Sequence, residues 1–188
     1  MTEDPDPSAG SMPTKQTKGA EAEIMVLHQD SGWKSLGFDV ETVCREAASS
    51  TLSAAEADDG ALEISIVLAD DQLLRRLNRD NLGQDHPTNV LAFPGDSLIG
   101  EVPKGVPCLL GDVVLSRTTI SREAGEQGKS IADHLRHLIV HGSLHLLGYT
   151  HDTDDDARNM ESLEKKVLAQ MGVRNPYASS GPDLGDAA

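Results

Sequence analysis

The sequence is poor in cysteine, aromatic residues, positive charge and long apolar runs. Its 188 residues include two cysteines and 3% aromatics, and 16 Lys and Arg stand against 31 Asp and Glu, so the net charge is −15. With so little cysteine, a fold held by disulfides is not expected, and we expect Cys44 and Cys108 to be free thiols. The acidic balance excludes capture of nucleic acid through a broad basic surface. Any contact with RNA or DNA must therefore be local.

No apolar run approaches the ~18 residues that span a bilayer, which excludes a transmembrane protein. The mean hydropathy of −0.34 and the 38% hydrophobic content are typical of a soluble globular chain. The first residues, MTEDPDPSAG, are acidic and proline-containing rather than basic and apolar. We therefore expect no secretory signal and a cytoplasmic location.

Composition divides the chain into a body and two tails. Residues 1–22 and 175–188 are rich in small, polar and acidic residues and lack hydrophobic periodicity. We expect a disordered amino-terminal tail and a flexible carboxyl-terminal tail, because such segments bury too little apolar surface to offset their ordering entropy. Residues 23–174 remain for a single domain, which can bury roughly two thirds of the surface of its unfolded chain.

Hydrophobic periodicity predicts the elements of this body. Strands are expected at 23–28, 62–69, 88–93 and 112–116, of which the second has the clearest alternation of side chains. The order of elements predicts a small α+β domain, or a three-layer α/β sheet domain, with helices clustered toward the carboxyl end. Helices are expected after Asp39, after Asp71, from Thr118, from Ser130 and over 155–171.

The last of these helices is predicted to be amphipathic, with an apolar stripe against the core and a charged face in solvent. The apolar stripe consists of Met160, Leu163, Val167 and Met171. The charged side chains assigned to the solvated face are Glu161, Glu164, Lys165 and Lys166.

Five of the seven histidines fall within residues 134–151, which is the most informative feature of the sequence. His141 and His145 lie one helical turn apart, so both imidazoles can reach a single ion at about 2.0–2.1 Å. Gly148 then allows a left-handed reversal that carries His151 back as a third ligand. Three nitrogen ligands leave a fourth tetrahedral position open, as in catalytic zinc sites. The pattern predicts one Zn²⁺ per chain, although imidazole also suits other divalent transition metals.

The alternative is that these histidines are surface or capping residues, because cations are favourable near the carboxyl end of a helix. His137 is also four residues from His141, but no turn follows that pair to supply a third ligand, and we expect His134 and His137 to lie outside the site. A metalloprotease of the HExxH type is disfavoured, because Gly142 stands where that mechanism needs a glutamate.

Three segments match the motifs of one known family. HGSLHLLGYTH at 141–151 is similar to H-G-x-L-H-L-x-G-Y-D-H, PTNVLAFP at 87–94 to K-P-T-[DN]-V-L-S-F-P without its lysine, and LGDVV at 110–114 to L-G-D-[IVL]-x. In these motifs the chain resembles the bacterial YbeY family of rRNA-maturation endoribonucleases. The resemblance implies a mixed-sheet α+β fold and a metal held by His141, His145 and His151. It also implies cleavage of single-stranded rRNA in the maturation and quality control of the small ribosomal subunit, alongside ribosome-assembly proteins.

The chain departs from that family just before the second segment. Where the family reads Y-R-G-K-D-K-P-T, this chain reads NLGQDHPT at 81–88, so Leu82 replaces an arginine associated with catalysis and two lysines are also lost. Leucine cannot grip phosphate or stabilise transition-state charge. We hypothesise that Arg79, one helical turn earlier, or Arg75 or Arg76 supplies a substitute cation. Asp112 and Asn89 are candidate pocket residues, and of these two we expect Asp112 to be catalytic. Candidate cations for a local RNA-binding patch are Arg75, Arg76, Arg79, Arg117, Arg122, Lys129 and Arg136.

Two functions of different classes follow. The first is a metal-dependent, single-strand-specific endoribonuclease of small-subunit rRNA maturation. The alternative is a metal-stabilised ribosome-assembly factor that does not cut RNA, which the loss of three cations at 81–88 favours. A hydrolase of another phosphate or amide substrate is a third reading, because an open three-histidine site is chemically versatile.

Overall fold

The computed structural model describes residues 22–57, 61–95 and 106–177. The strands in these ranges are β1 (Ala22–His28), β2 (Leu62–Ala69), β3 (Val90–Pro94) and β4 (Cys108–Ser116). The helices are the 3-10 helix η1 (Ser31–Ser35), α1 (Val40–Ala54), α2 (Asp71–Leu82), α3 (Arg117–Glu126), α4 (Ile131–Leu146) and α5 (Asp154–Gln170). Of these elements, η1 has no counterpart in the sequence-based prediction.

One mixed sheet organises the fold, with the strand order β1-β2-β4-β3. Strands β1, β2 and β4 run parallel, and β3 pairs antiparallel with β4. Parallel neighbours need a crossover connection, which α1 provides between β1 and β2. A small mixed sheet packed against several helices confirms the predicted α+β class.

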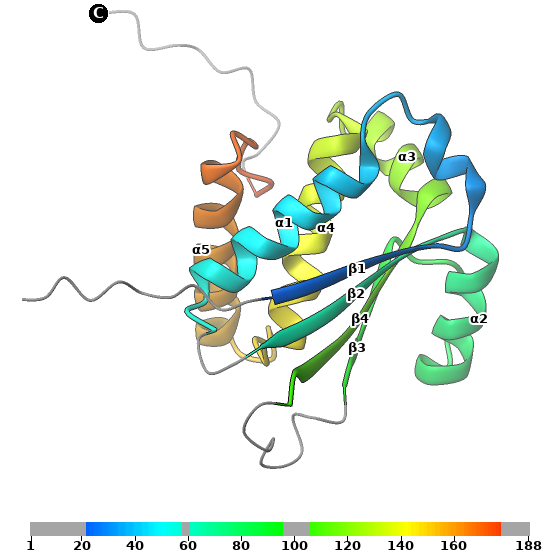
Figure 1. The fold of residues 1–188 in the computed structure, drawn as a ribbon. Helices are drawn as coiled ribbons and strands as arrows, with labels where there is room; N and C mark the ends of the chain where they lie inside the picture. Colours follow the sequence, from blue (N-terminus) through cyan, green and yellow to red (C-terminus); the bar gives the residue numbers. More distant parts are fainter. Residues whose placement is uncertain (1–21, 58–60, 96–105, 178–188) are drawn as a thin grey trace, which may run out of the picture.

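Helices lie on both faces of the sheet, with α1 and α4 on one face and α2 on the other (Figure 1). Neighbouring residues of a strand point to opposite faces. Ile66 and Val113 accordingly face the main core with α1 and α4, whereas Val67 and Val114 pack with the side chains of α2. Candidate site residues can form one site only if they lie on the same face of the sheet.

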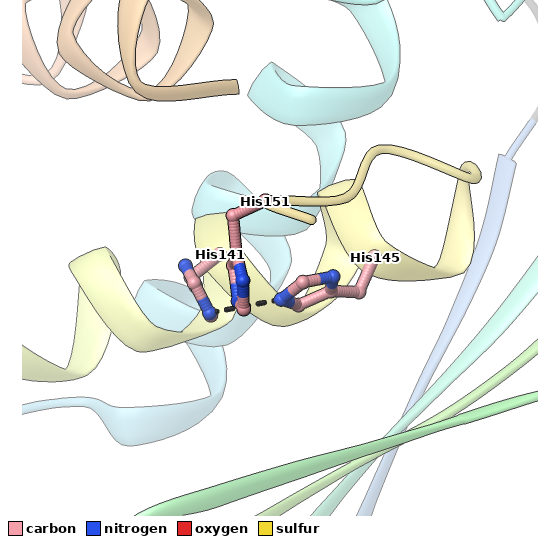
Figure 2. A group of neighbouring side chains, drawn as sticks. All are labelled: His141, His145 and His151. Carbon is pink, nitrogen blue, oxygen red and sulfur yellow. Dashed lines mark hydrogen bonds between the residues drawn. The ribbon is translucent and has the colours of Figure 1, made fainter. Parts of the chain in front are cut away.

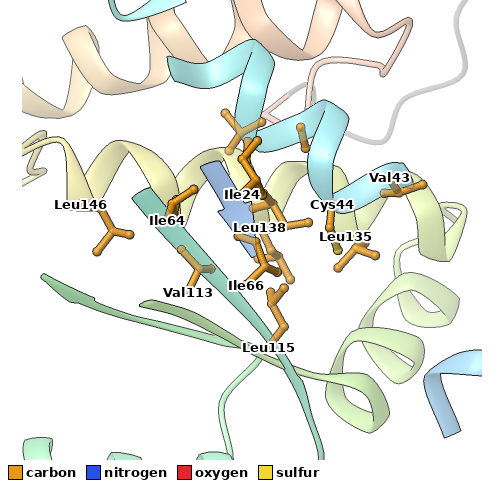
Figure 3. Packing of buried hydrophobic residues seen from close by; sticks show 14 of the residues in the cluster. Ile24, Val43, Cys44, Ile64, Ile66, Val113, Leu115, Leu135, Leu138 and Leu146 are labelled. Carbon is orange, nitrogen blue, oxygen red and sulfur yellow. The ribbon is translucent and has the colours of Figure 1, made fainter. Parts of the chain in front are cut away.

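The main core lies between the sheet and the layer of α1 and α4 (Figure 3). Its buried side chains include those of Ile24, Ile64 and Ile66 from the sheet, Val43 and Cys44 from α1, and Leu135, Leu138 and Leu146 from α4. Helix α4 therefore has a fixed position against the sheet, and so does any site built on it.

Strand β4 is longer than the predicted 112–116 and contains a β-bulge. The register with β2 shifts between Glu63 and Ile64, which leaves Leu110 as the extra residue of β4. The bulge interrupts the alternation of side chains that the prediction relied on, and the strand in fact begins at Cys108. Gly111 follows the bulge at a φ of +128°, where a Cβ would lie 2.1 Å from the carbonyl oxygen of Phe93.

The residues that cap the N-termini of the helices are largely those that the sequence predicts. Asp39 accepts from Thr42 N at 3.1 Å, and Ser130 accepts from Asp133 N at 3.0 Å. For α2 the cap is Asp70, which accepts from Leu73 N at 2.9 Å. Asp71, expected just before that helix, is its first residue.

The predicted amino-terminal tail lies outside the described residues except for Ala22, which begins β1. Of the predicted carboxyl-terminal tail, residues 175–177 are described, and the side chain of Tyr177 contacts α5. Cys44 is buried, Cys108 is half-buried, and both are free thiols. Among the described helices, none has the length and apolar character that crossing a membrane requires.

Candidate metal centre

Helix α4 and the turn after it position the three predicted ligands. The missing side chain at Gly142 lets α4 lie close to the sheet, because a Cβ there would be 2.8 Å from Val113 Cγ1. After Leu146 the chain reverses through Gly148, whose φ is +88°. This reversal, predicted from the glycine, brings His151 back over the last turn of α4.

The side chains of His141, His145 and His151 converge (Figure 2). One ring nitrogen from each lies within 4.8 Å of the others, a spacing that can hold a metal ion. His141 and His145 project from successive turns of α4 and are half-buried, whereas His151 comes from the following loop and is exposed. The group is therefore anchored on a buried helix and open to solvent on one side.

Hydrogen bonds assign the protons of the two helix histidines. Nδ1 of His145 lies 3.0 Å from the carbonyl oxygen of Tyr149, and Nδ1 of His141 lies 2.7 Å from Oε1 of Glu164. Because carbonyl and carboxylate oxygens only accept, each Nδ1 carries the proton. In neutral rings each Nε2 is then an acceptor, and the two Nε2 atoms face each other at 3.0 Å. Two facing acceptors repel unless a cation lies beside them.

This donor set fits a tetrahedral divalent ion. Two nitrogens bound at about 2.0–2.1 Å in a tetrahedron lie about 3.3 Å apart, close to the 3.0 Å between the Nε2 atoms of His141 and His145. Burial, and then the charge of His141, lower the pKa of His145. Both effects favour the neutral imidazole, which is the form that binds metal.

Glu164 of α5 contacts the candidate site, and its assignment to a solvated face is wrong. Its side chain is fully buried beside His141. Burial alone would raise the pKa of Glu164, but contacts with His137, His141 and Tyr177 outweigh burial and lower it to about 2. Glu164 is therefore an ionised carboxylate. A signal was present in the sequence, because residue 164 falls one helical turn from both Met160 and Val167, on the apolar stripe itself.

The other two histidines of α4 lie outside the group of three, as expected. His134 Nε2 lies 2.8 Å from Oε2 of Glu123, which also accepts from Asn89 Nδ2 at 2.9 Å. His137 Nε2 lies 3.7 Å from Oε2 of Glu164, which is beyond hydrogen-bond distance.

Arg79 and Asp112 do not share the face of the sheet on which the histidines lie. Arg79 is on α2, where its Nε donates to Asp80 Oδ1 at 2.9 Å. Asp112 is exposed and pairs with Phe93, whose side chain packs with those of α2. The histidines are on the opposite side, on α4 and in the loop that follows it. The structure therefore brings together the three predicted ligands but not the two predicted catalytic residues.

The candidate cations of an RNA-binding patch are divided in the same way. Three of them lie on α2, and the others lie on or next to α3 and α4, on the opposite face. Most are paired with an acid. The ion pairs are Arg75–Asp85, Arg79–Asp80, Arg117–Asp30, Arg122–Glu126 and Arg136–Asp133. The expectation of one local patch made of these residues is therefore not met.

The family profile and the relatives found by sequence name one family. The profile of the family described as "Endoribonuclease YbeY" matches residues 27–172. A protein of that name from Paramagnetospirillum magneticum is 49% identical over 156 residues, covering 82% of this chain and 95% of the relative. Another from Rhodopseudomonas palustris is 40% identical over 176 residues, covering 93% and 89%. A solution structure of a Thermotoga maritima protein has a TM-score of 0.49 at 23% identity, covering 85% of this chain and 97% of that one.

The matched range contains the sheet, α4 and all three converging histidines. The profile covers well over half of the chain, and the two relatives align along most of their own length. The chain therefore belongs to the YbeY endoribonuclease family.

Proposed function

We propose that this chain is a metal-dependent endoribonuclease that cuts single-stranded RNA, with one Zn²⁺ held by His141, His145 and His151. The observation that carries the proposal is the convergence of these three rings, in which Nε2 of His141 and Nε2 of His145 face each other at 3.0 Å. Its relatives are named as endoribonucleases, which gives the reaction class.

A divalent ion at this position, when bound, supplies Lewis acidity toward a phosphate oxygen and an attacking water. The protein's own part is to hold the nitrogen donors in place and to leave one side of them open. His151 is exposed, so an RNA strand can approach from its side. Glu164 is fully buried behind His141, and it therefore cannot serve as the base that deprotonates an attacking water.

The biological setting that we propose is small-subunit rRNA maturation and ribosome quality control in the cytoplasm. The proposed partners are the pre-ribosomal small subunit and ribosome-assembly proteins. With a net charge of −15, the protein gains little from general attraction to RNA, so recognition depends on local contacts. A pre-ribosomal particle can present its RNA at a fixed place and so reduce the need for such attraction.

A role for Arg79 and Asp112 in cleavage stays a prediction from the sequence. An RNA strand would have to pass around the β3 edge of the sheet to contact both these residues and the histidines. Arg79→Ala and Asp112→Asn test this path. Loss of cleavage with unchanged zinc content would support a substrate path over α2. Unchanged cleavage in both variants would show that neither residue takes part in the reaction.

A specific observation favours the alternative of an assembly factor that does not cut RNA. Leu82, which the motif resemblance places at an arginine position of the family, is the last residue of α2 and is 60% exposed. An exposed leucine offers a protein partner an apolar contact but gives a phosphate no hydrogen bond. Zinc binding without cleavage would support this alternative.

The deciding experiment is cleavage of a single-stranded rRNA fragment by zinc-loaded protein, with zinc content measured on the same samples. We expect His141→Ala and His145→Ala to lose cleavage and zinc together. His28→Ala, which changes a histidine of β1 that pairs with Glu41, is the matched control and should keep both. Equal cleavage in all four proteins would identify a contaminating nuclease and contradict the proposal.

A further inference from the structure

Glu164 and Tyr177 form a contact behind the histidines that the proposed reaction does not use directly. Oε1 of Glu164 accepts from Nδ1 of His141 at 2.7 Å, and Oε2 accepts from the hydroxyl of Tyr177. The carboxylate therefore joins a predicted metal ligand on α4 to the segment that follows α5. His137 is its third neighbour, at 3.7 Å from Oε2.

The position of Glu164 is not explained by packing. Its neighbours on the inner face of α5, Met160 and Val167, are apolar and buried. A buried carboxylate is costly unless it is paired, and an apolar residue of similar size would often be at least as stable there. The charge therefore needs a reason other than stability, and the group that it contacts most closely is His141.

The two helix ligands are held by different groups. Nδ1 of His145 donates to a neutral backbone carbonyl, that of Tyr149, whereas Nδ1 of His141 donates to a carboxylate. A carboxylate behind an imidazole fixes its tautomer and ring orientation and raises the basicity of the opposite nitrogen. In this structure that opposite nitrogen is Nε2 of His141, which faces His145 (Figure 2).

We propose that Glu164 is a positioning residue for the metal centre, that it holds His141 with Nε2 unprotonated and turned toward His145, and that Tyr177 in turn holds Glu164. The inference rests on the proposed metal site, since it assigns Glu164 a role through one of its ligands. It also gives the segment after α5 a function, because the hydroxyl of Tyr177 binds the carboxylate oxygen that His141 leaves free.

The ring of Tyr177 is itself held in place. It meets the ring of His137 edge to face, with 5.9 Å between centroids, and Nζ of Lys165 lies 4.8 Å from its centroid. These contacts fix the ring on α4 and α5 together. The part of the chain that supports the metal centre therefore extends at least to Tyr177.

The first test needs no metal. In ¹⁵N-histidine NMR spectra of the metal-free protein at a pH where His141 is neutral, we expect His141 to be protonated at Nδ1 and not at Nε2. Comparison with His141→Ala assigns the signal. Finding His141 protonated at Nε2 would overturn the inference, because Glu164 would then not be receiving the Nδ1 proton.

The second test is zinc affinity, measured by competition with a chromophoric chelator. Glu164→Gln should bind zinc about 10–100-fold more weakly, which is the usual effect of removing such a partner. Tyr177→Phe, which keeps the carboxylate, should weaken binding by a smaller factor. Glu126→Gln is the matched control, because it makes the same Glu-to-Gln change at an exposed position of α3, where Glu126 pairs with Arg122, and it should not change the affinity.

Thermal unfolding of the metal-free variants separates positioning from folding. If Glu164→Gln folds and its zinc affinity is within about twofold of that of the wild type, the inference is overturned. If that variant does not fold, an unchanged zinc affinity of Tyr177→Phe would overturn it instead. The proposed metal site fails in a different way, namely if the wild type binds no zinc or if His145→Ala binds it equally well.

Discussion

Nε2 of His141 and Nε2 of His145 face each other at 3.0 Å across one turn of α4, and in neutral rings the hydrogen bonds at both Nδ1 atoms leave neither Nε2 with a proton. A cation between these atoms and His151 would turn a repulsive contact into an attractive one. Ligand binding to the folded state alone raises stability by about 2.7 kcal/mol when the free ligand is at 100 times its dissociation constant. Zinc should therefore raise the melting temperature of the wild type, and a chelator should reverse the change.

In calorimetry, His145→Ala should lose most of this zinc-dependent shift. Mg²⁺ is the control ion, because it prefers oxygen ligands and should give no shift in either protein. An equal response of wild type and variant to zinc would place the stabilising ion somewhere other than at these histidines.

Gly111 should tolerate no side chain. Its φ of +128° is unfavourable for other residues, and a Cβ would lie 2.1 Å from the carbonyl oxygen of Phe93 on the paired strand. We expect Gly111→Ala to lower the free energy of unfolding in urea by about 2–4 kcal/mol. Gly125→Ala is the matched control, because a Cβ at this position in α3 meets nothing within 4 Å. That change should be neutral or stabilise by up to about 1 kcal/mol, and equal effects of the two changes would contradict this account of the bulge.

Local patterns were sufficient to predict most of the elements and the convergence of the three histidines. The alternation over 62–69 gives β2, the i, i+4 spacing gives His141 and His145, and Gly148 gives the reversal to His151. Each of these signals depends only on residues close together in the sequence. The bulge at Leu110 was not predicted, because it interrupts the alternation by which strands are recognised.

Contacts between distant segments could not be predicted in the same way. Asp112 of β4 and Arg79 of α2 lie on the side of the sheet opposite to the histidines. No local pattern in the sequence reveals on which face of the sheet a strand residue will lie. Glu164 was assigned to solvent by residue type, although its position on the apolar stripe indicated burial. Its partner, His141, lies 23 residues away on another helix, so the contact appears only in the folded chain.

The two thiols should react with a thiol reagent at very different rates. Cys44 is fully buried, and burial, followed by the charge of Glu41, raises the pKa of its thiol to about 12. Since the thiolate is the reactive form, Cys44 should be inert in the folded protein, whereas the half-buried Cys108 should be labelled. Labelling with Ellman's reagent should give one thiol per native chain and two after denaturation. Cys108→Ser should remove the native signal, and rapid labelling of that variant would show that Cys44 is accessible.

Asp30 should make stability depend on pH in acid solution. Its Oδ1 accepts from Gly32 N at 2.9 Å and its Oδ2 from Arg117 Nε at 2.6 Å, and these bonds lower the pKa of Asp30 below the ordinary value of 3.8. A carboxylate with a lowered folded-state pKa stabilises the fold above its unfolded pKa, and this contribution is lost as the pH falls through the folded value. Asp30→Asn keeps an acceptor for Gly32 but removes the ion pair with Arg117. It should lower the free energy of unfolding by about 1–2 kcal/mol at pH 7.

The difference between wild type and Asp30→Asn should shrink below about pH 4, where the carboxyl group of the unfolded wild-type chain becomes protonated. Asp80→Asn is the control, because the Asp80–Arg79 pair is exposed, with 61% and 52% of the two side chains accessible. Exposed pairs contribute about 0–1 kcal/mol, so this change should have little effect at either pH. Urea unfolding of the three proteins at both pH values measures the difference, and a gap that stays constant with pH would show that the charge of Asp30 does not stabilise the fold.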